Sequence, residues 1–588
     1  MKIFLLSLLA SVIHVYAEHP VSLTEQKPVS ITKCPDGAYL VDFGKVAFAN
    51  IQLSPPESTT EELTIHFGEA FDKNVRRINR KPPGTVRYNL AKIKLAGAKS
   101  IIVAPPADAR NTETKTDKHP PAILTPPEWG VILPFRWVEI EGWPGDLKPE
   151  HITRRAAFAT AWNDEDSRFT SSNDTLNKIW NLCKYSIQAT TFAGVYVDGD
   201  RERIPYEADA YINQLCHYYT SFDSDFARRS YDYLINYGTW PTEWAPHMVF
   251  IAHADWMRNG DAKWLAARYE KLKTKTLLER AGLDGLIKST KKHMTKGDIV
   301  DWPHTERDGY VFTHTNTVVN AFHIKALRDM GDIAEAIGKM DEAKHFRTLA
   351  AQKLVTFQKN LFNEAKGNYR DGIGTDHSSQ HANFFPLAFG LVPQDKKDGV
   401  IRFISNKGMN CSVYASQYFM EALFQNGADA EAMNLILADH DRSWKHMLNT
   451  GTTITYEAWD QKYKPNQDWN HAWGAAPANL LPRFVLGAQA LKPGWGKALI
   501  RPHIAKLSSA SGKIPTPKGA ILVDWKNKET FTISITLPDG MTAQVELPAT
   551  PGSQGVSVNG TPAKAVRKMN RWVLEQEISG KVNLTVTK

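Results

Sequence analysis

The segment 197–209 concentrates groups that can exchange protons. It reads VDGDRERIPYEAD and places five carboxylates and two arginines within thirteen residues. Carboxylates this close repel one another, and the repulsion raises the pKa of at least one of them. A raised carboxyl pKa is what a general acid needs near neutral pH. A salt-bridged surface loop has the same composition, so this segment alone does not establish a catalytic site.

A second carboxylate, Glu457, has aromatic and imidazole neighbours in the sequence. Trp459 follows it closely, and the segment 469–474 reads WNHAWG, with His471 at its centre. A sugar site needs an acid or base at the glycosidic oxygen, polar groups for hydroxyls, and indoles against the apolar ring face. Taken alone, Glu457 fits a surface acid and His471 fits a structural histidine. Together with the acidic segment, they predict a carbohydrate site with two carboxylates.

Three further loops have a similar composition. The segments 240–244 (WPTEW), 298–304 (DIVDWPH) and 376–381 (DHSSQH) combine acids, histidines and tryptophans. Each would be ordinary in isolation. We expect them to meet on one rim of a helical domain and to line a shared cleft.

No metal or cofactor is expected. His377 and His381 are four residues apart, a spacing that suits zinc on a helix, but no glutamate lies between them. The chain contains no Gly-x-Ser-x-Gly motif and no phosphate-binding glycine loop.

The elements that position these loops are helices between residues 165 and 495. Apolar residues recur at helical spacing in several segments of this region, and long polar-aromatic loops separate them. The segments are 176–187, 210–219, 226–235, 321–330, 346–357 and 433–437. No repeat of fixed period is visible, which disfavours a solenoid. The pattern predicts a toroid of paired helices.

Alternating apolar residues predict β-structure on both sides of this region. The segments 39–43, 63–67 and 136–141 alternate before it, and 521–525 and 531–537 alternate after it. Residues 105–127 are rich in proline and charge and predict a surface loop. We therefore predict a multidomain protein with an all-α toroid between two β-sandwich domains. The predicted bounds are 1–17 for a signal peptide, 18–164, 165–495 and 496–588.

Composition narrows the function further. The net charge of +8 is spread along 588 residues without a dense Lys/Arg run, so nucleic-acid binding has little support. A mild basic balance is compatible with an acidic polysaccharide as the partner. Residues 1–17 have a basic start, an apolar run and a small-residue cleavage site, which predicts a secreted or periplasmic protein without a membrane span.

The cysteines match no metal-binding spacing. They are Cys34, Cys183, Cys216 and Cys411. Cys183 lies on the apolar face of a predicted helix and is expected to be a buried thiol. A disulfide between Cys183 and Cys216 stays open, because connectivity does not follow from sequence.

The acidic segment resembles the signature of glycoside hydrolase family 78, the α-L-rhamnosidases. The resemblance extends over nearly the whole mature chain. Residues 39–44 and 136–142 resemble the family's N-terminal β-sandwich, and 165–495 resemble its (α/α)6 barrel. Residues 470–474 and the strands after 494 resemble the end of the barrel and the C-terminal sandwich.

The resemblance implies a role for each matching residue. Glu202 would be the general acid and Glu457 the general base. The residues implied in sugar binding are Asp198, Asp209, Trp244 and His471, and the further candidates are Arg201, Tyr206, Trp302 and Trp459. Asp200 and Glu207 are expected only to balance the charges of Arg201 and Arg203.

The sequence departs from the family pattern in several places. The Cys-Pro after the first aspartate is absent, and the spacing from Asp198 to Glu202 is shorter by two residues. Residues 205–208 read PYEA instead of the usual Gly-Trp-x-Gly, and Pro246 replaces an expected aspartate. These departures bear on the substrate range, because the region around Tyr206 shapes the pocket.

The resulting expectation is a secreted, inverting exo-glycosidase that releases terminal α-L-rhamnose from an oligosaccharide or polysaccharide. Inversion predicts catalytic carboxyl groups about 6.5–9.5 Å apart, whereas retention predicts about 5–5.5 Å. One alternative is a six-hairpin glycosidase that acts on another deoxy sugar or a uronic acid. A second alternative is a carbohydrate-binding protein without catalysis.

Overall fold

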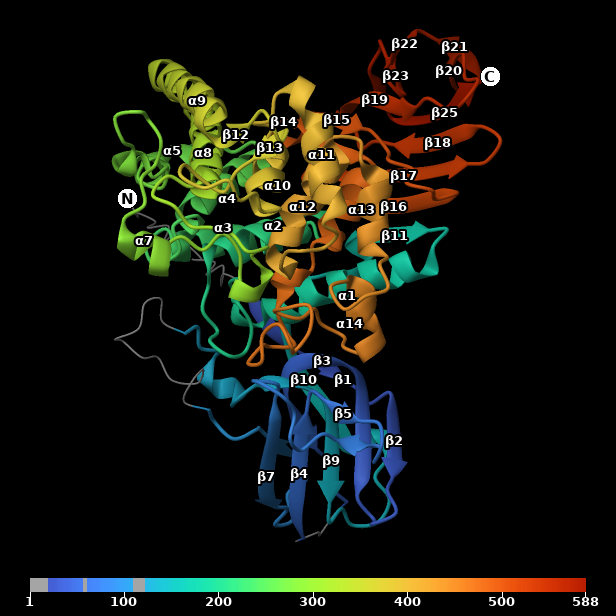
Figure 1. Cartoon of the computed structure of the whole chain (residues 1–588). Coiled ribbons are helices and arrows are strands. Elements are labelled where there is room, and N and C mark those ends of the chain that lie inside the picture. The colour runs from blue at the N-terminus through green and yellow to red at the C-terminus, as the bar shows by residue number, and fades with distance from the viewer. Residues whose placement is uncertain (1–19, 57–60, 109–121) are drawn as a thin grey trace, which may run out of the picture.

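The computed structural model describes residues 20–56, 61–108 and 122–588. The predicted signal peptide, residues 1–17, and the middle of the 105–127 loop lie outside the described residues. Along the chain, a β-rich domain is followed by a helical domain and a second β-rich domain (Figure 1). Among the described residues, no helix combines the length and apolar character needed to cross a membrane.

The N-terminal domain is built on an antiparallel sheet with its own core. Alternating residues of its strands, such as Val41, Ile65 and Val138, are buried together on one face, as the period-two pattern predicts. Along the main path of the sheet, the strands are β1 (Val21–Gln26), β10 (Ile152–Ala159), β3 (Tyr39–Leu53), β9 (Leu133–Glu141), β4 (Glu62–Gly68) and β7 (Tyr88–Lys94), and β2 (Ser30–Lys33) and β8 (Ile101–Val103) pair with β3. A separate short hairpin consists of β5 (Phe71–Asp72) and β6 (Arg77–Ile78).

The helical domain is a closed ring of inner helices with outer helices around it. Each inner helix contacts the next, and the last contacts the first. The inner helices are α2 (Glu207–Thr220), α4 (Trp244–Asn259), α8 (Thr317–Ala336), α10 (His381–Ala388), α12 (Val413–Gln425) and α15 (Pro477–Leu480). This closed arrangement is the predicted (α/α)6 toroid.

Outer helices precede the inner helices in the chain. They are α1 (Asp174–Ala189), α3 (Asp225–Leu234), α5 (Ala262–Ala266), α6 (Tyr269–Lys273), α7 (Lys291–Lys296), α9 (Met340–Leu361), α11 (Lys397–Asn406), α13 (Asp429–Ile436) and α14 (Trp444–Thr450). The periodic segments correspond to α1, α2, α3, α8, α9 and α13. The periodicity did not single out α4, α10 and α12. In α12 every residue from Val413 to Phe424 is buried, so no polar face marks the helical period.

The second β-rich domain contains two sheets. The first follows the order β11 (Arg168–Ser171), β16 (Ser509–Thr516), β17 (Gly519–Asn527), β18 (Phe531–Thr536), β25 (Lys581–Thr587), β20 (Gly555–Val558) and β21 (Thr561–Ala563). The second contains β14 (Ala488–Lys492), β15 (Lys497–Ile500), β19 (Thr542–Pro548), β23 (Arg571–Leu574), β22 (Ala565–Lys568) and β24 (Ile578–Ser579). The segment expected to be all-helical therefore begins and ends with strands, β11 and β14, that pair with this domain.

The helical domain and the C-terminal domain share one hydrophobic core. Trp525 of β17 is fully buried, and its indole nitrogen donates a hydrogen bond of 2.9 Å to the carbonyl of Val485 at the end of the inner ring. The four cysteines are buried free thiols, so Cys183 and Cys216 form no disulfide.

Candidate active site

The acids expected to act in catalysis or sugar binding, Asp198, Glu202, Asp209 and Glu457, meet in one small cavity at the N-terminal end of the inner ring. Its volume is about 150 Å³. The connections that lead into α2, α4, α8 and α15 supply its walls, together with the first turns of α2 and α4. We call it the acidic cavity, and its lining residues are Asp198, Arg201, Glu202, Tyr206, Asp209, Trp240, Trp244, Ile299, Trp302, Glu457, His471 and Trp473.

A tight turn presents the acidic segment to this cavity. The backbone N–H of Asp198 donates to the carbonyl of Ile204 at 3.0 Å, and the Ile204 N–H donates to Asp198 Oδ1 at 3.1 Å. Gly199 has a φ of +135°, and a Cβ atom there would lie 2.9 Å from a carboxylate oxygen of Asp468. The turn therefore requires glycine at this position.

Arg201 binds Glu457 through two hydrogen bonds. Its Nη1 lies 2.9 Å from Oε2 of Glu457, and its Nη2 lies 3.0 Å from Oε1. Lys464, itself buried, lies 3.3 Å from the same carboxylate. Burial by itself would raise the pKa of Glu457, but Arg201, His471 and Lys464 outweigh burial and lower it. The carboxylate form of Glu457 is thus favoured, as a general base requires.

Glu202 lies on the other side of the same guanidinium. Arg201 Nε is 3.7 Å from Glu202 Oε1, and the Tyr206 hydroxyl donates a hydrogen bond of 2.7 Å to Glu202 Oε2. The side chain of Glu202 is 37% exposed, whereas that of Glu457 is 2% exposed. The more accessible carboxyl group is therefore the one that a leaving group at the mouth can reach.

Asp198 and Asp209 are buried acids beside the two glutamates. Burial, and secondly the charge of Glu202, raises the pKa of Asp198 well above its ordinary value. Burial also raises the pKa of Asp209, although His471 opposes this shift. Asp209 Oδ1 lies 2.7 Å from His471 Nε2, and the other ring nitrogen of His471 is buried without a partner among the described residues. The carboxyl groups of Asp198 and Asp209 and the ring of His471 are suited to hydrogen-bond a bound polyol.

Aromatic rings form the remaining walls. Tyr206 and Trp244 meet edge to face, with ring centroids 5.4 Å apart. Trp302 is half-buried in the lining, and Trp240 is 55% exposed there. These rings provide the apolar surfaces that a sugar face requires.

The prediction that Trp459 binds the substrate is wrong, because Trp459 does not line the acidic cavity. Trp459 is fully buried, and its ring packs edge to face on Trp444 with centroids 5.0 Å apart. Its indole nitrogen donates to the carbonyl of Cys411 at 2.7 Å. Trp459 therefore belongs to the core of the ring, because the side chain turns inward where Glu457 turns toward the cavity.

Asp200 and Glu207 were both expected to pair with arginines of the acidic segment, and in the described structure only Asp200 does so. Asp200 binds Arg203, with Oδ1 3.0 Å from Nη2, and both are buried. Glu207 binds no arginine in the described part of the chain. Its Oε1 accepts the backbone N–H of Thr239 at 2.9 Å, and its other oxygen accepts the Thr239 hydroxyl. Glu207 therefore ties the start of α2 to the loop that leads into α4.

The N-terminal domain supplies part of the support for the acidic segment. Arg87, which precedes β7, forms a buried ion pair with Asp200. Glu69 accepts hydrogen bonds from the Arg87 backbone at 2.6 Å and from the Asn470 amide at 2.8 Å. Asn470 in turn accepts the Asp200 N–H at 2.8 Å. Burial raises the pKa of Glu69 to about 8, so its protonated form is favoured in this network.

Several residues of the site were not predicted from the sequence. Trp240 and Trp473 lie in tryptophan-rich segments that the sequence had marked, so that signal could have found them. Lys464 and Arg87 carry no such signal, because their importance depends on where the fold places them.

The potential metal ligands have other partners. His377 lies beside Asp371 and His381 beside Asp301, so each histidine is engaged by a different acid. Glu457, Asp468 and His471 offer ligand atoms within 4.8 Å of one another. In this cluster the oxygens of Glu457 already contact the cations Arg201 and Lys464. The cluster is therefore an ion-pair network.

Comparison with known proteins identifies the architecture. Residues 164–485 match the bacterial alpha-L-rhamnosidase six-hairpin glycosidase domain. Residues 32–158 match the concanavalin-like domain, and residues 487–561 match the C-terminal domain, of the same proteins.

The chain is also similar to individual proteins. An alpha-L-rhamnosidase of Alteromonas sp. (strain LOR) is 23% identical over 561 residues, which cover 89% of this chain and 57% of that protein. The chain thus spans a little over half the length of this curated relative.

The solved structures of alpha-L-rhamnosidases show the same fold. The one from Dictyoglumus thermophilum has a TM-score of 0.77 and 19% identity, over 96% of this chain and 63% of that one. The one from Streptomyces avermitilis, complexed with L-rhamnose, has a TM-score of 0.77 and 17% identity, over 97% and 54%. Since the six-hairpin match covers more than half of its residues, the chain belongs to the bacterial alpha-L-rhamnosidase six-hairpin glycosidase family.

Proposed function

We propose that this protein is an exo-acting, inverting α-L-rhamnosidase in which Glu202 is the general acid and Glu457 the general base. The observation that carries the proposal is the arrangement around Arg201, whose guanidinium lies between an accessible glutamate and a buried one in a single small cavity. Membership of the family and the L-rhamnose complex of the Streptomyces avermitilis relative support rhamnose as the sugar.

The proposed reaction uses the two glutamates on opposite sides of the sugar. Glu202 donates its proton to the glycosidic oxygen as the bond from that oxygen to the anomeric carbon breaks. Glu457, held as a carboxylate by Arg201 and Lys464, takes a proton from a water molecule while the water oxygen bonds to the anomeric carbon. Because water attacks the face opposite the leaving group, the anomeric configuration inverts.

The remaining polar groups would hold the sugar. Asp198, whose pKa is raised by burial and secondly by the charge of Glu202, can hydrogen-bond a sugar hydroxyl. Asp209 and His471 hold each other in place, and the second ring nitrogen of His471, which has no partner in the described part of the chain, can bond another hydroxyl. A cavity of about 150 Å³ is smaller than the roughly 300–1,000 Å³ of drug-sized sites, which favours one terminal sugar and hence exo action.

The wider biological setting belongs to the same proposal. We propose that the substrate is a rhamnose-containing oligosaccharide or polysaccharide, and the net charge of +8 favours acidic chains among these. We further propose export of the protein, which the apolar segment 1–17 supports. N-terminal sequencing of the mature protein tests the export, with cleavage after residue 17 as the expected result.

The test of the catalytic roles compares two substrates and two variants. Glu202→Gln should lower kcat on natural glycans by about 10²–10⁴-fold, but far less on an aryl rhamnoside, whose leaving group needs no proton. Glu457→Gln should lower kcat on both substrates, because activation of water is needed in either case. Glu364→Gln, which changes an exposed glutamate paired with Lys396, is the matched control.

Proton NMR of the first turnovers reports the stereochemistry. The released rhamnose should appear first as the β anomer, and an initial α anomer would exclude inversion. Release from fucosyl or glucuronyl aryl glycosides, but not from rhamnosyl ones, would favour a different six-hairpin glycosidase. Binding of rhamnose without any turnover would favour a carbohydrate-binding protein.

A further inference from the structure

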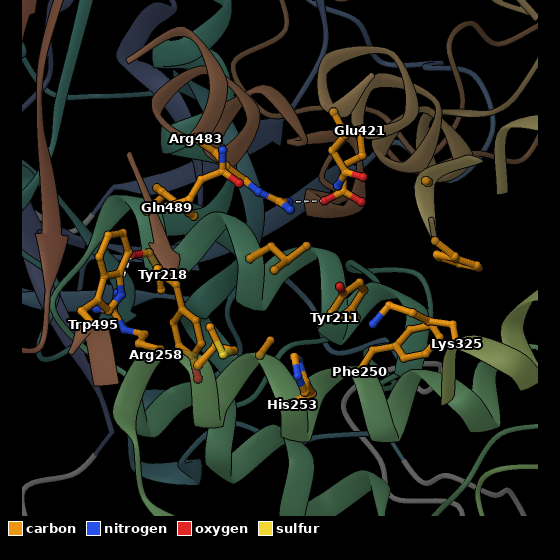
Figure 2. A pocket seen from close by; sticks show the side chains of 18 residues that line it. Tyr211, Tyr218, Phe250, His253, Arg258, Lys325, Glu421, Arg483, Gln489 and Trp495 are labelled. Atoms are coloured by element: carbon orange, nitrogen blue, oxygen red, sulfur yellow. Dashed lines mark hydrogen bonds and ion pairs between the residues drawn. The ribbon is translucent and has the colours of Figure 1, made fainter. Parts of the chain in front are cut away.

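A second cavity enters the inner ring from the end opposite the acidic cavity. Its volume is about 260 Å³. Its walls come from the middle and C-terminal parts of α2, α4, α8, α10 and α12, and from the segment after α15. The acidic cavity lies at the N-terminal end of the ring. Figure 2 shows Arg483 and Glu421 reaching toward each other on one side, with Tyr211, Phe250 and Trp495 around the space. We call it the rear cavity.

A layer of aromatic side chains separates the two cavities. Tyr211, which lines the rear cavity, stacks on Tyr418 with ring centroids 6.4 Å apart. Tyr418 in turn packs on Tyr414, and Tyr414 stacks on Trp473 of the acidic cavity at 5.6 Å. A molecule in the rear cavity would therefore be distinct from the substrate of the proposed reaction.

Several polar groups at the rear cavity have unused hydrogen-bonding capacity. Tyr211 is half-buried and makes no hydrogen bond through its hydroxyl among the described residues, whereas the amide nitrogen of Gln489 is fully buried and has no partner there. In the described structure, the contact between Arg483 and Glu421 joins Nη1 to Oε1, which leaves further donors on Arg483 and a second acceptor oxygen on Glu421. Because buried polar groups are normally hydrogen-bonded, the Gln489 amide favours a polar ligand, and Tyr211, Arg483 and Glu421 can supply further hydrogen bonds to it.

Two of the three Lys and Arg side chains that line the rear cavity, Lys325 and Arg483, are paired with acids. Glu421 neutralises Arg483, and Lys325 is paired with Asp329. The guanidinium of Arg258 donates to backbone carbonyls, including that of Tyr218 at 2.6 Å. The inner helices α2, α4, α10 and α12 also end near this side, and helix C-termini carry partial negative charge. Glu421 and the helix ends would therefore repel an anion, which favours a neutral ligand.

Apolar rings complete the lining. Phe250, Phe389 and Trp495 all face the cavity. Aromatic faces combined with a charged pair that can both donate and accept are suited to sugar rings, whose faces are apolar and whose rims carry hydroxyl groups. The volume fits a ligand smaller than the drug-sized molecules found in larger sites.

We propose that the rear cavity is a second, non-catalytic site that binds a neutral monosaccharide unit through Tyr211, Glu421, Arg483 and Gln489. The site would let the protein hold a glycan end or a released sugar while the acidic cavity is occupied. Its existence does not depend on the catalytic roles of Glu202 and Glu457.

Two variants address the rear cavity separately from the acidic cavity. Tyr211→Phe removes only the free hydroxyl group. Ala254→Leu places a larger side chain on the α4 wall of the cavity. Tyr237→Phe, an exposed tyrosine that lies outside both linings, is the control. Both test variants should leave hydrolysis of an aryl rhamnoside unchanged.

The binding experiment uses L-rhamnose, D-xylose and D-glucuronate as probes. Crystals soaked in each sugar locate it, and equilibrium dialysis of the full chain counts the equivalents bound at saturation. At least one neutral sugar should occupy the rear cavity in the parent protein. Tyr211→Phe should weaken that binding about 3- to 10-fold, as loss of one hydrogen bond predicts, and Ala254→Leu should abolish it.

The proposal fails if neither neutral sugar enters the rear cavity, if D-glucuronate binds there as tightly, or if Tyr211→Phe binds like the parent. The last comparison stands even if Ala254→Leu does not fold. Failure of Glu202→Gln to impair hydrolysis would overturn the proposed catalytic role and would leave this proposal intact.

Discussion

At the scale of residues, Arg201 organises the proposed chemistry. It contacts Glu457 through two hydrogen bonds and lies 3.7 Å from Glu202. A cation close to one carboxylate stabilises its charged form. The site therefore contains two carboxyl groups in different environments, one buried among cations and one partly open to solvent, which is the condition for separate acid and base roles.

Removing the charge of Arg201 should shift the pH profile in a defined direction. The pKa of Glu457 lies below its ordinary value because Arg201, His471 and Lys464 outweigh burial. Arg201→Gln leaves burial less opposed, so the pKa of Glu457 should rise. The acid limb of kcat/KM against pH should move upward accordingly. Lys464→Met should move it less in the same direction, and an unchanged limb in both variants would exclude Glu457 as the base.

Trp240 should contribute to binding beyond the terminal sugar. Its side chain lines the acidic cavity yet is 55% exposed, which is suited to stacking on the next ring of a glycan. Trp240→Ala should raise KM for oligosaccharides about 3- to 10-fold and leave KM for methyl α-L-rhamnoside unchanged. Tyr237→Ala, in the same connection but outside the lining, is the control. An equal rise in KM for both substrates would place the role of Trp240 at the terminal sugar instead.

At the scale of elements, the connections before the inner helices carry the site, and the N-terminal domain helps to hold one of them. Arg87 and Glu69 reach Asp200 and Asn470 from outside the helical ring. Asp200 is buried between Arg87 and Arg203. Because an unpaired buried charge is costly, this contact fixes the segment that presents Arg201 and Glu202.

Loss of the Arg87 contact should reduce both stability and activity. Arg87→Met removes one of the two arginines that contact Asp200 among the described residues, and breaking a buried ion pair costs about 3–5 kcal/mol. We expect a lower midpoint of urea unfolding together with a lower kcat. Arg168→Met, at an exposed position of β11, should change neither. If Arg87→Met matched the parent in both measurements, the N-terminal domain would not be needed to position the segment.

At the scale of the whole molecule, one hydrophobic cluster joins the helical domain and the C-terminal domain, whereas most of the N-terminal sheet has a core of its own. The strands β11 and β14 flank the helical region and pair with C-terminal strands. We therefore expect the helices and the C-terminal sheets to unfold together.

Trp525 tests this cooperativity. Trp525→Ala removes a fully buried indole, and such truncations cost about 3–5 kcal/mol. Loss of helical circular dichroism and loss of activity should shift together to lower temperature. Trp137→Ala in the N-terminal domain, where the ring stacks on Phe71, should affect the helical transition much less. Independent unfolding of the C-terminal sheets, with the helices intact, would contradict the shared core.

The sequence by itself determined the order of the domains, the helices with one polar face, and most of the segments that meet in the acidic cavity. Of the three further loops expected there, 240–244 and 298–304 line the cavity, and 376–381 does not. Periodicity reveals a helix only when polar and apolar faces alternate, so it missed α12, which is buried on all sides. Glu202, Glu457 and His471 were identifiable because acids and aromatic residues clustered around them and matched a known signature.

Only the tertiary structure decided which way individual side chains turn and which distant groups they meet. Trp459 packs into the core two residues from Glu457, and Glu207 bonds Thr239 instead of an arginine. Lys464 and Arg87 enter the site network from positions without any sequence signal. The physical reason is that spacing along a loop does not fix side-chain direction, whereas packing against other elements does.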